Sequence, residues 1–209
     1  MRLGILGPAQ GDLPALARGA QQLLDESRAE KVLYLADDYA LDEVVAGWAQ
    51  KLVGANADEA ALFDRAASRC AVASPAEVDA FVASERARLR LKVLVSLPAS
   101  PGRTIEFLDG RVVLFVYDKA ALDEEDIVAA SLLVFGKSQE PMIKKVGTRT
   151  FMAPGWVTSE TGGRALLDDA SGGLHIEIFN AKGVVSAREF IGASPRSAAK
   201  FKVQGGSAD

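Results

Sequence analysis

Residues 133–141 read LVFGKSQEP, an apolar run followed by a glycine, a lysine and a serine. The apolar run predicts a buried strand, and the GKS triplet resembles the end of a nucleotide-binding P-loop. A P-loop also needs a glycine five residues before its Gly-Lys pair, so that backbone N–H groups can wrap the phosphate, but this position is Ser131. The lysine should open a helix, yet Pro141 follows four residues later. We therefore expect the stretch to end a strand and to bind no nucleotide in this way.

The segments around this stretch predict a mostly β half of the chain. Two alternating runs on either side of the turn Asp109-Gly110 predict a hairpin, and a second hairpin surrounds Gly147. A short acidic helix should lie between the first hairpin and the strand at 132–135. The expected strands are 104–108, 112–117, 132–135, 143–146, 150–153, 174–179 and 184–190, and the expected helix is 123–130.

The N-terminal half has a different rhythm, in which strands alternate with helices. A strand at 2–6 is followed by a helix that Asp12 and Pro14 open, and then by a strand at 32–35. Further helices are expected at 41–52, 58–68 and 74–89. Alternation of this kind is typical of a layered α/β fold with parallel strands. We therefore predict an α/β protein in which two sheets pack together with helices outside.

The composition is that of an ordinary globular protein. The 209 residues include 49% apolar and 25% charged residues, and the net charge is −4 without a basic stripe, so nucleic acid is not an expected partner. No apolar run is long enough to span a bilayer, the start MRLGILG does not resemble a signal peptide, and the single Cys70 has no disulfide partner. We expect a cytoplasmic protein with one domain over 1–192 and a flexible tail over 193–209.

Six short motifs follow one another in an order known from one protein family. The motifs are GILGPAQGDLPAL (4–16), LYLADD (33–38), LVGANAD (52–58), VVLFVYD (112–118), LLVFGKSQEP (132–141) and MAPGW (152–156). In this order they resemble the calcineurin-like metallophosphoesterases, in particular the small phosphodiesterase branch, over essentially residues 2–192. The resemblance implies a four-layer α/β/β/α sandwich with mixed sheets. It also implies two divalent metals, held by loops at the strand ends.

The metal ligands of that family do not carry over to this chain. The family uses an aspartate and a histidine in the first motif, a bridging aspartate in the second, an asparagine in the third, and three histidines in the fourth and fifth. The corresponding positions, which would line the former site, are Pro8, Gln10, Asp37, Asn56, Tyr117, Lys137 and Gln139, with Trp156 beside them. Only Asp37 and Asn56 match, so these two are the remnant ligand positions.

The replacements are poor metal ligands. Proline offers no side-chain lone pair, glutamine offers a neutral amide oxygen, and a protonated lysine repels a cation. The single histidine, His175, falls in an alternating strand far from these motifs, where we expect a surface residue. We therefore expect no catalytic residue, no two-metal hydrolysis and no cofactor. A divalent metal held weakly at Asp37 and Asn56 is the alternative.

Lys137 suggests a replacement for the lost metal charge. Asp37 and Lys137 would both project from adjacent strand ends into one pocket, and a carboxylate buried alone is costly. We predict that the two side chains form an ion pair; the alternative is that both point into solvent. Trp156 stands where a small serine is usual in the family, and it would plug the pocket, present an aromatic anchor to a partner, or simply pack.

Three functions remain open from the sequence. The first is a non-catalytic scaffold or regulatory subunit that binds another protein, because the fold is kept while the reactive centre is not. The second is a binder of an anionic small molecule or nucleotide through Lys137 and the amides around it. The third is a residual metal-dependent phosphodiesterase that uses Asp37 and Asn56. We favour the scaffold and lean against an enzyme, and exposed sheet edges would also allow a homodimer.

Overall fold

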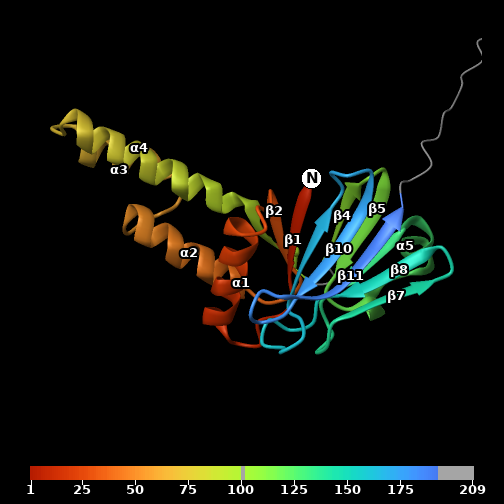
Figure 1. Ribbon diagram of the computed structural model, residues 1–209. Helices are drawn as coiled ribbons and strands as arrows, with labels where there is room; N and C mark the ends of the chain where they lie inside the picture. The colour runs from red at the N-terminus through yellow and green to blue at the C-terminus, as the bar shows by residue number, and fades with distance from the viewer. Residues whose placement is uncertain (100–101, 193–209) are drawn as a thin grey trace, which may run out of the picture.

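The computed structural model describes residues 1–99 and 102–192 of the chain. Two β-sheets pack face to face, and helices lie outside them (Figure 1). Within these residues the first sheet has the strand order β11 (Val185–Gly192), β10 (Gly173–Phe179), β9 (Arg164–Asp168), β1 (Arg2–Leu6), β2 (Lys31–Tyr34) and β3 (Leu94–Ser96). The second sheet has the order β4 (Arg103–Leu108), β5 (Arg111–Val116), β6 (Leu132–Phe135), β8 (Arg149–Ala153) and β7 (Met142–Val146).

Both sheets are mixed, as the sequence predicts. In the first sheet β1, β2 and β3 are parallel, whereas β9, β10 and β11 pair with their neighbours in antiparallel fashion. In the second sheet β5, β6 and β8 are parallel, and β4 and β7 are antiparallel edge strands. Parallel strands end on the same side of a sheet. The loops after β1 and β2 therefore gather at one edge, where they meet the loops after β5 and β6.

The main core lies between the two sheets. Leu3 and Ile5 of β1 face Phe115 of β5 and Val134 of β6, and all four side chains are fully buried. Alternate residues of a strand point to opposite faces, so each strand gives one row of side chains to this core and another to the helices. Burying one such side chain contributes roughly 1.5–3 kcal/mol of stability.

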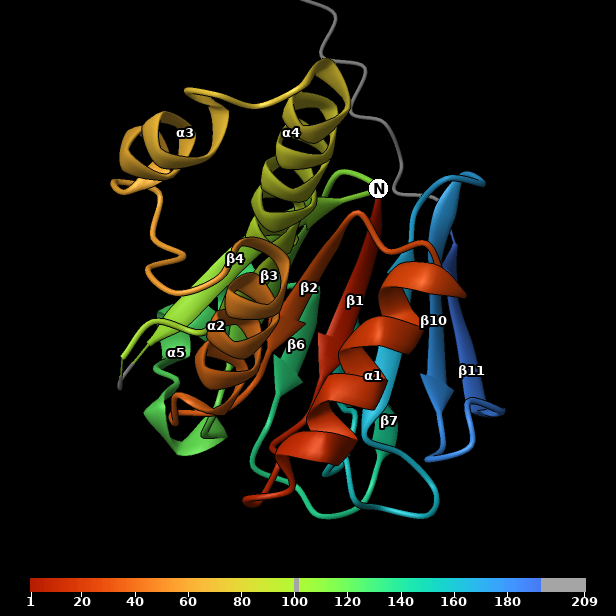
Figure 2. The same ribbon diagram turned by 90° about the vertical axis from the view of Figure 1, so that its left-hand side faces the viewer.

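Helices cover the outer faces of both sheets, which confirms the predicted four-layer order. The helices α1 (Leu13–Asp25) and α2 (Ala40–Val53) lie over the first sheet (Figure 2). The first of them begins as predicted, because the Asp12 side chain accepts a hydrogen bond from the Ala15 N–H at 2.8 Å and Pro14 lies in the first turn. The fourth layer is thin, since within 1–99 and 102–192 only the short α5 (Glu124–Ala129) and the 3₁₀ turn at 119–121 cover the second sheet.

The helices α3 (Leu62–Cys70) and α4 (Pro75–Arg90) form a helical arm that projects from the sandwich (Figure 1). Three buried charged side chains join the two helices. Arg65 of α3 and Arg88 of α4 both donate to the Glu85 carboxylate, at 2.7 and 2.8 Å, and each of the three residues is at most 7% exposed. Arg65 also donates to the backbone carbonyls of Asn56 and Asp58. The base of the arm is thus held by ion pairs rather than by an apolar core.

The sequence patterns do not predict two of the strands. β9 lies in the middle of the first sheet, and β3 is the third parallel strand, reached from α4 through the 3₁₀ turn at 91–93. The 52–58 motif begins inside the helix predicted over 41–52, which the structure ends at Val53. The predicted tail at 193–209 lies outside the described residues, and the single-domain boundary at 192 stays a prediction. Among the described helices, none has both the length and the apolar character that crossing a membrane requires.

Candidate functional site

The loops after the parallel strands approach one another through glycines. A Cβ atom added to Gly7 would lie 1.7 Å from the carbonyl oxygen of Gly155, and one added to Gly136 would lie 1.8 Å from that of Leu35. These distances are far below van der Waals contact, so the glycines are required for the backbones to pack. The same loops share hydrogen bonds, since the Val157 N–H donates to the Pro8 carbonyl at 3.1 Å. The glycines of the motifs therefore allow the loops at the strand ends to pack closely against one another.

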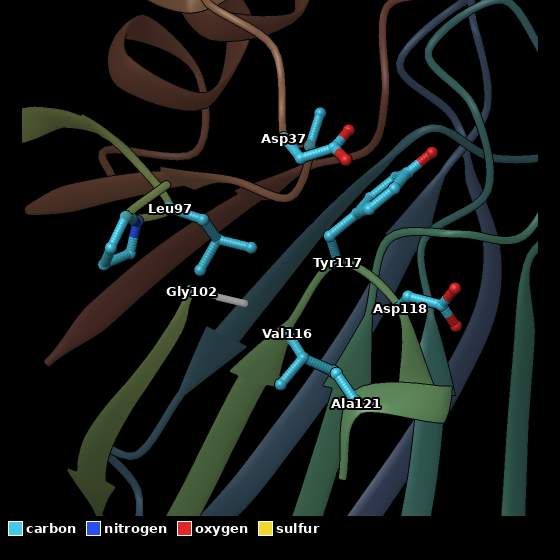
Figure 3. Close-up of a pocket in the computed structure, with 9 residues that line it drawn as sticks. Asp37, Leu97, Gly102, Val116, Tyr117, Asp118 and Ala121 are labelled. Carbon is cyan, nitrogen blue, oxygen red and sulfur yellow. The ribbon is translucent and has the colours of Figure 1, made fainter. Parts of the chain in front are cut away.

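A very small cavity lies between the segments that follow β2, β3 and β5 (Figure 3). Its volume is about 30 Å³, which is room for a single water molecule. The residues around it are Ala36, Asp37, Leu97, Pro98, Gly102, Val116, Tyr117, Asp118 and Ala121. Two of the predicted site residues, Asp37 and Tyr117, thus come together from different sheets. No organic ligand fits into a space of this size without movement of the loops.

Tyr117 closes one side of this cavity. Its ring lies beside the Asp37 carboxylate (Figure 3). Its side chain also packs against the core between the two sheets and against the apolar cluster under α1 and α2. Burial raises the pKa of the Tyr117 phenol, and the negative charge of Asp37 raises it further. The phenol is therefore neutral at physiological pH, and it stands beside a carboxylate that is exposed to solvent.

Lys137 does not pair with Asp37, and this prediction is wrong. The Lys137 Nζ donates to the Asp118 carboxylate at 2.5 Å instead. Its backbone N–H also donates to the Tyr117 carbonyl at 2.8 Å, so the end of β6 is fixed against the end of β5, the strand that delivers Asp118. The hydrogen bond from Lys137 lowers the pKa of the Asp118 carboxyl, and the same bond raises the pKa of the lysine. The sequence offers a signal for this partner only in the final residue of the motif VVLFVYD.

This ion pair predicts a specific change in titration. In Lys137→Met the pKa of the Asp118 carboxyl should rise, because the hydrogen-bonding ammonium is gone. Carboxyl-carbon NMR over a pH series measures this directly. Lys144→Met removes an exposed lysine of β7 and serves as the matched control, which should leave the Asp118 titration in place. An Asp118 titration that is identical in Lys137→Met and in the unmodified protein would count against the pair.

Tyr34 is a site residue that the sequence patterns do not reveal. It is fully buried, its hydroxyl accepts the Ala9 N–H at 3.0 Å, and it donates to the Asp38 carboxylate at 3.3 Å. The phenol thereby ties the loop after β1 to the loop after β2. Burial is the main cause that raises the pKa of Tyr34 above its ordinary value.

The buried phenol predicts a loss of stability at high pH. A phenol whose pKa is higher in the folded than in the unfolded protein favours folding until the unfolded phenol ionises, near pH 10, and this stability is then lost as pH rises toward the folded pKa. The unfolding free energy of Tyr34→Phe should consequently fall less steeply above pH 10 than that of the unmodified protein. At neutral pH the variant should be less stable by about 1–3 kcal/mol, because the Ala9 N–H loses its acceptor. Tyr39→Phe, at a position that is 79% exposed, should behave like the unmodified protein in urea titrations at both pH values.

Asn56 is not part of this group of residues. It follows the last turn of α2, whereas Asp37 precedes the first turn, and the 14 residues of this helix span about 21 Å. The cavities beside Asp37 do not include Asn56, which lines another one between α2 and α4. The two remnant ligand positions are therefore too far apart to share a metal. The strand that ends beside Asp37 is β3, and Leu97 and Pro98 follow it there.

The remaining predicted residues stand around the edge of the site. Pro8 is buried, Gln10 and Gln139 are exposed, and Trp156 is half-buried. The backbone of Gln10 has a φ of 52°, a left-handed conformation that is uncommon for a residue with a side chain. The Gln139 carbonyl accepts the Trp156 N–H at 3.1 Å. Trp156 is thus tied to the loop after β6 by its backbone.

The side chains at these strand ends do not fit a two-metal centre. The groups around Asp37 are a phenol, a proline ring and three further carboxylates. Asp118 is paired with Lys137, Asp38 accepts the Tyr34 hydroxyl and Asp42 accepts the Ser96 hydroxyl. Two close divalent ions need several anionic or imidazole ligands to offset their repulsion. Among the residues that the structure describes, no group of three histidines, cysteines, aspartates or glutamates is placed to hold a metal.

Comparisons with known proteins find similarity in structure alone. No protein-family model and no curated protein matches the chain. The chain is similar in structure to proteins described as phosphoesterases. A predicted phosphoesterase from Streptococcus pneumoniae is 9% identical with a TM-score of 0.49, and covers 91% of this chain and 98% of its own. An archaeal phosphodiesterase is 14% identical with a TM-score of 0.44, covering 91% of this chain and all of its own.

A third similar structure is Vacuolar Protein Sorting 29 from Cryptosporidium parvum. It is 11% identical with a TM-score of 0.47, and covers 91% of this chain and 97% of its own. No activity or partner is transferred from these chains to this one. The two mixed sheets and the flanking helices are themselves consistent with the metallophosphoesterase-like fold that the motif order implies.

Proposed function

We propose that this chain is a protein-interaction scaffold or regulatory subunit, built on a metallophosphoesterase-like fold without a working two-metal centre. One observation carries the proposal. At the strand ends, where the resembled family holds its metals, Lys137 is bonded to Asp118 beside a cavity of about 30 Å³. An ammonium in this position opposes cation binding, and the small cavity has no room for a phosphoester. The adjoining open groove is lined by Asp37, Asp38 and Asp42, whose carboxylates repel one.

The helical arm supports the scaffold and offers a surface for the partner. Phe63 and Val72 on the arm are 82% and 98% exposed, and Val82 is 37% exposed. Apolar side chains on a projecting, internally braced pair of helices are suited to burial against another protein. The partner surface should accordingly be apolar, because burial of these side chains would supply most of the binding energy.

The absence of metal chemistry can be tested with manganese. In metal-stripped protein, excess manganese should leave the melting temperature unchanged, and a generic phosphodiester should not be hydrolysed faster than by Asp37→Ala. A metal present at one hundred times its dissociation constant would instead stabilise the fold by about 2.7 kcal/mol, which is several degrees for a chain of this size. Such a shift, lost in Asp37→Ala together with hydrolysis, would restore the residual-enzyme reading.

The scaffold itself is tested through the arm. Proteins captured by the unmodified chain from its native cell extract should be lost with Phe63→Asp/Val72→Asp and retained with Val184→Asp. The last variant alters a 60% exposed valine in the β10–β11 turn and serves as the matched control. Once a captured partner is purified, the arm variant should bind it at least about tenfold more weakly. Equal affinity of the partner for the unmodified chain and for both variants would show that the partner does not bind through the arm.

An anion binder receives less support. The open groove next to the small cavity has a volume of about 360 Å³, and Asp37, Asp38 and Asp42 all line it. Three carboxylates repel an anionic ligand, and the nearby Lys137 is already paired. The cytoplasmic location and the homodimer stay predictions, which cell fractionation and sedimentation would test.

A further inference from the structure

Strand β4 is a free edge of the second sheet with unpaired backbone groups. It pairs only with β5 among the described residues, and a two-residue turn with positive φ at Asp109 and Gly110 joins the two strands. The residues flanking such a turn, here Leu108 and Arg111, exchange both backbone hydrogen bonds. Counting back in twos, Glu106 also bonds to β5. The N–H and C=O groups of Ile105 and Phe107 therefore point away from the sheet.

The same two residues expose apolar side chains. Ile105 is 52% and Phe107 is 72% exposed, and they stand opposite Leu114 and Val112 on the outer face of the sheet. Protein edges are usually blunted by charges, proline or bulges, because a regular apolar edge attracts another strand. Arg103, which would serve this purpose, is bonded to Asp126 of α5 instead. The edge thus has the backbone and side-chain features of a strand that is paired in solution.

The charges around the edge favour a basic partner strand. Glu106, between Ile105 and Phe107 in the sequence, points to the inner face of β4 and forms an ion pair with Lys31. At the Arg103 end stands the acidic first turn of α5. A second copy of the chain, paired edge to edge about a two-fold axis, would bring two such sets of carboxylates together, which is unfavourable.

The C-terminal segment of the chain has the matching chemistry. Residues 200–204 read KFKVQ, in which apolar and basic side chains alternate with the period of a strand. The basic residues after position 192 are Arg196, Lys200 and Lys202, against the single acidic Asp209. This segment follows β11, whose last residue, Gly192, accepts a hydrogen bond from Arg111 of β5. The chain therefore leaves the described structure beside the β4–β5 turn.

We propose that residues 200–204 add to the second sheet as an edge strand antiparallel to β4. Phe201 and Val203 cover the exposed side chains of Ile105 and Phe107, and the lysines lie on the face of Glu106. Residues 193–199 span up to about 23 Å when extended, which is enough to pass the β4–β5 turn and enter the edge. Because residues 200–204 and β4 belong to one chain, pairing is intramolecular, at an effective concentration on the order of millimolar.

Amide hydrogen exchange of the full chain, followed by NMR, tests the proposal. The N–H groups of Ile105 and Phe107 should be protected in the unmodified protein and exchange at least about tenfold faster in Phe201→Ser/Val203→Ser. The Glu106 N–H, which bonds to β5, should keep its protection in both and is the internal control. Ala198→Ser/Ala199→Ser, in the linking residues, is the matched variant and should exchange like the unmodified protein.

The possible results separate the occupants of the edge. Fast exchange of Ile105 and Phe107 in the unmodified protein would overturn the proposal, because the edge would then be free. Protection that survives in Phe201→Ser/Val203→Ser would overturn it as well, and dependence of that protection on protein concentration would identify a second copy as the occupant. A chain ending at Gly192 should match the double variant if residues 200–204 are the strand.

Discussion

Gly136→Ala should lower the free energy of unfolding by at least about 3 kcal/mol, and Gly7→Ala should do the same. At Gly136 the added Cβ would lie 1.8 Å from the carbonyl oxygen of Leu35, and both atoms belong to backbones that strands hold in place. No side-chain rotation can relieve such a contact. One of the two loops must therefore move, and the hydrogen bonds from Gly136 and Lys137 to the end of β5 are strained with it.

Gly47→Ala is the matched control for this prediction. Gly47 lies inside helix α2, and nothing stands within 4 Å of an added Cβ. Alanine is the better helix former, so this variant should gain up to about 1 kcal/mol. Urea titration followed by circular dichroism measures all three proteins. Similar midpoints for Gly136→Ala and Gly47→Ala would show that the loops can separate without loss.

Glu85→Ala should cost about 3–5 kcal/mol, because it leaves two buried guanidinium groups without their shared carboxylate. Arg65 and Arg88 are 6% and 7% exposed, so neither can reach water without a movement of the arm. The hydrogen bond from Arg65 lowers the pKa of the Glu85 carboxyl. This stability is thus present above the pKa of a glutamate in the unfolded chain and is lost as pH falls through the folded value.

Two further variants serve as controls for this prediction. Asp79→Ala changes an exposed carboxylate of the same helix and should have a much smaller effect. Replacing the whole group, as Arg65→Met/Glu85→Leu/Arg88→Met, should restore part of the loss, because no charge is then left buried without a partner. The restoration is incomplete because the Asn56 and Asp58 carbonyls lose the Arg65 donor. Hydrogen exchange should assign the loss in Glu85→Ala to α3 and α4 first. A uniform loss over both sheets would contradict a local role for the three charges.

Much of the fold follows from periodicity and turn chemistry in the sequence. The β4–β5 hairpin and the helix opened by Asp12 are confirmed, because each depends on neighbours in the chain. The two mixed sheets are confirmed as well, but they pair distant segments such as β1 and β9 and were implied by the resemblance. β3 is harder, since its three residues continue the apolar run after α4 without a turn signal. LVGANAD resembles the third motif of the family, and the resemblance alone placed Asn56 in the site. In the structure this motif follows the last turn of α2, at the far end of the helix from Asp37.

The site could be predicted in part, for a similar reason. Asp37 and Tyr117 meet because the order of parallel strands brings their loops together. The partner of Lys137 is harder to predict, because Asp37 and Asp118 both directly follow strand ends. Asp118 is the partner because the Lys137 backbone is hydrogen-bonded to Tyr117, the residue before Asp118. The sequence does not indicate a role for Tyr34 in the site, since a tyrosine at the end of a buried strand is usually an ordinary core residue. Its role depends on Ala9, which is distant in the sequence.

The glycine contacts between the loops separate the shape of the strand ends from their chemistry. The nearest atoms to a Cβ added at Gly7 and at Gly136 are the main-chain carbonyl groups of Gly155 and Leu35. The side chains at neighbouring positions such as Gln10 and Gln139 are exposed and take no part in these contacts. Natural or laboratory evolution can therefore exchange those side chains while the loop geometry persists. A set of metal-ligating residues could therefore be introduced at these positions by substitution, without a change of the backbone.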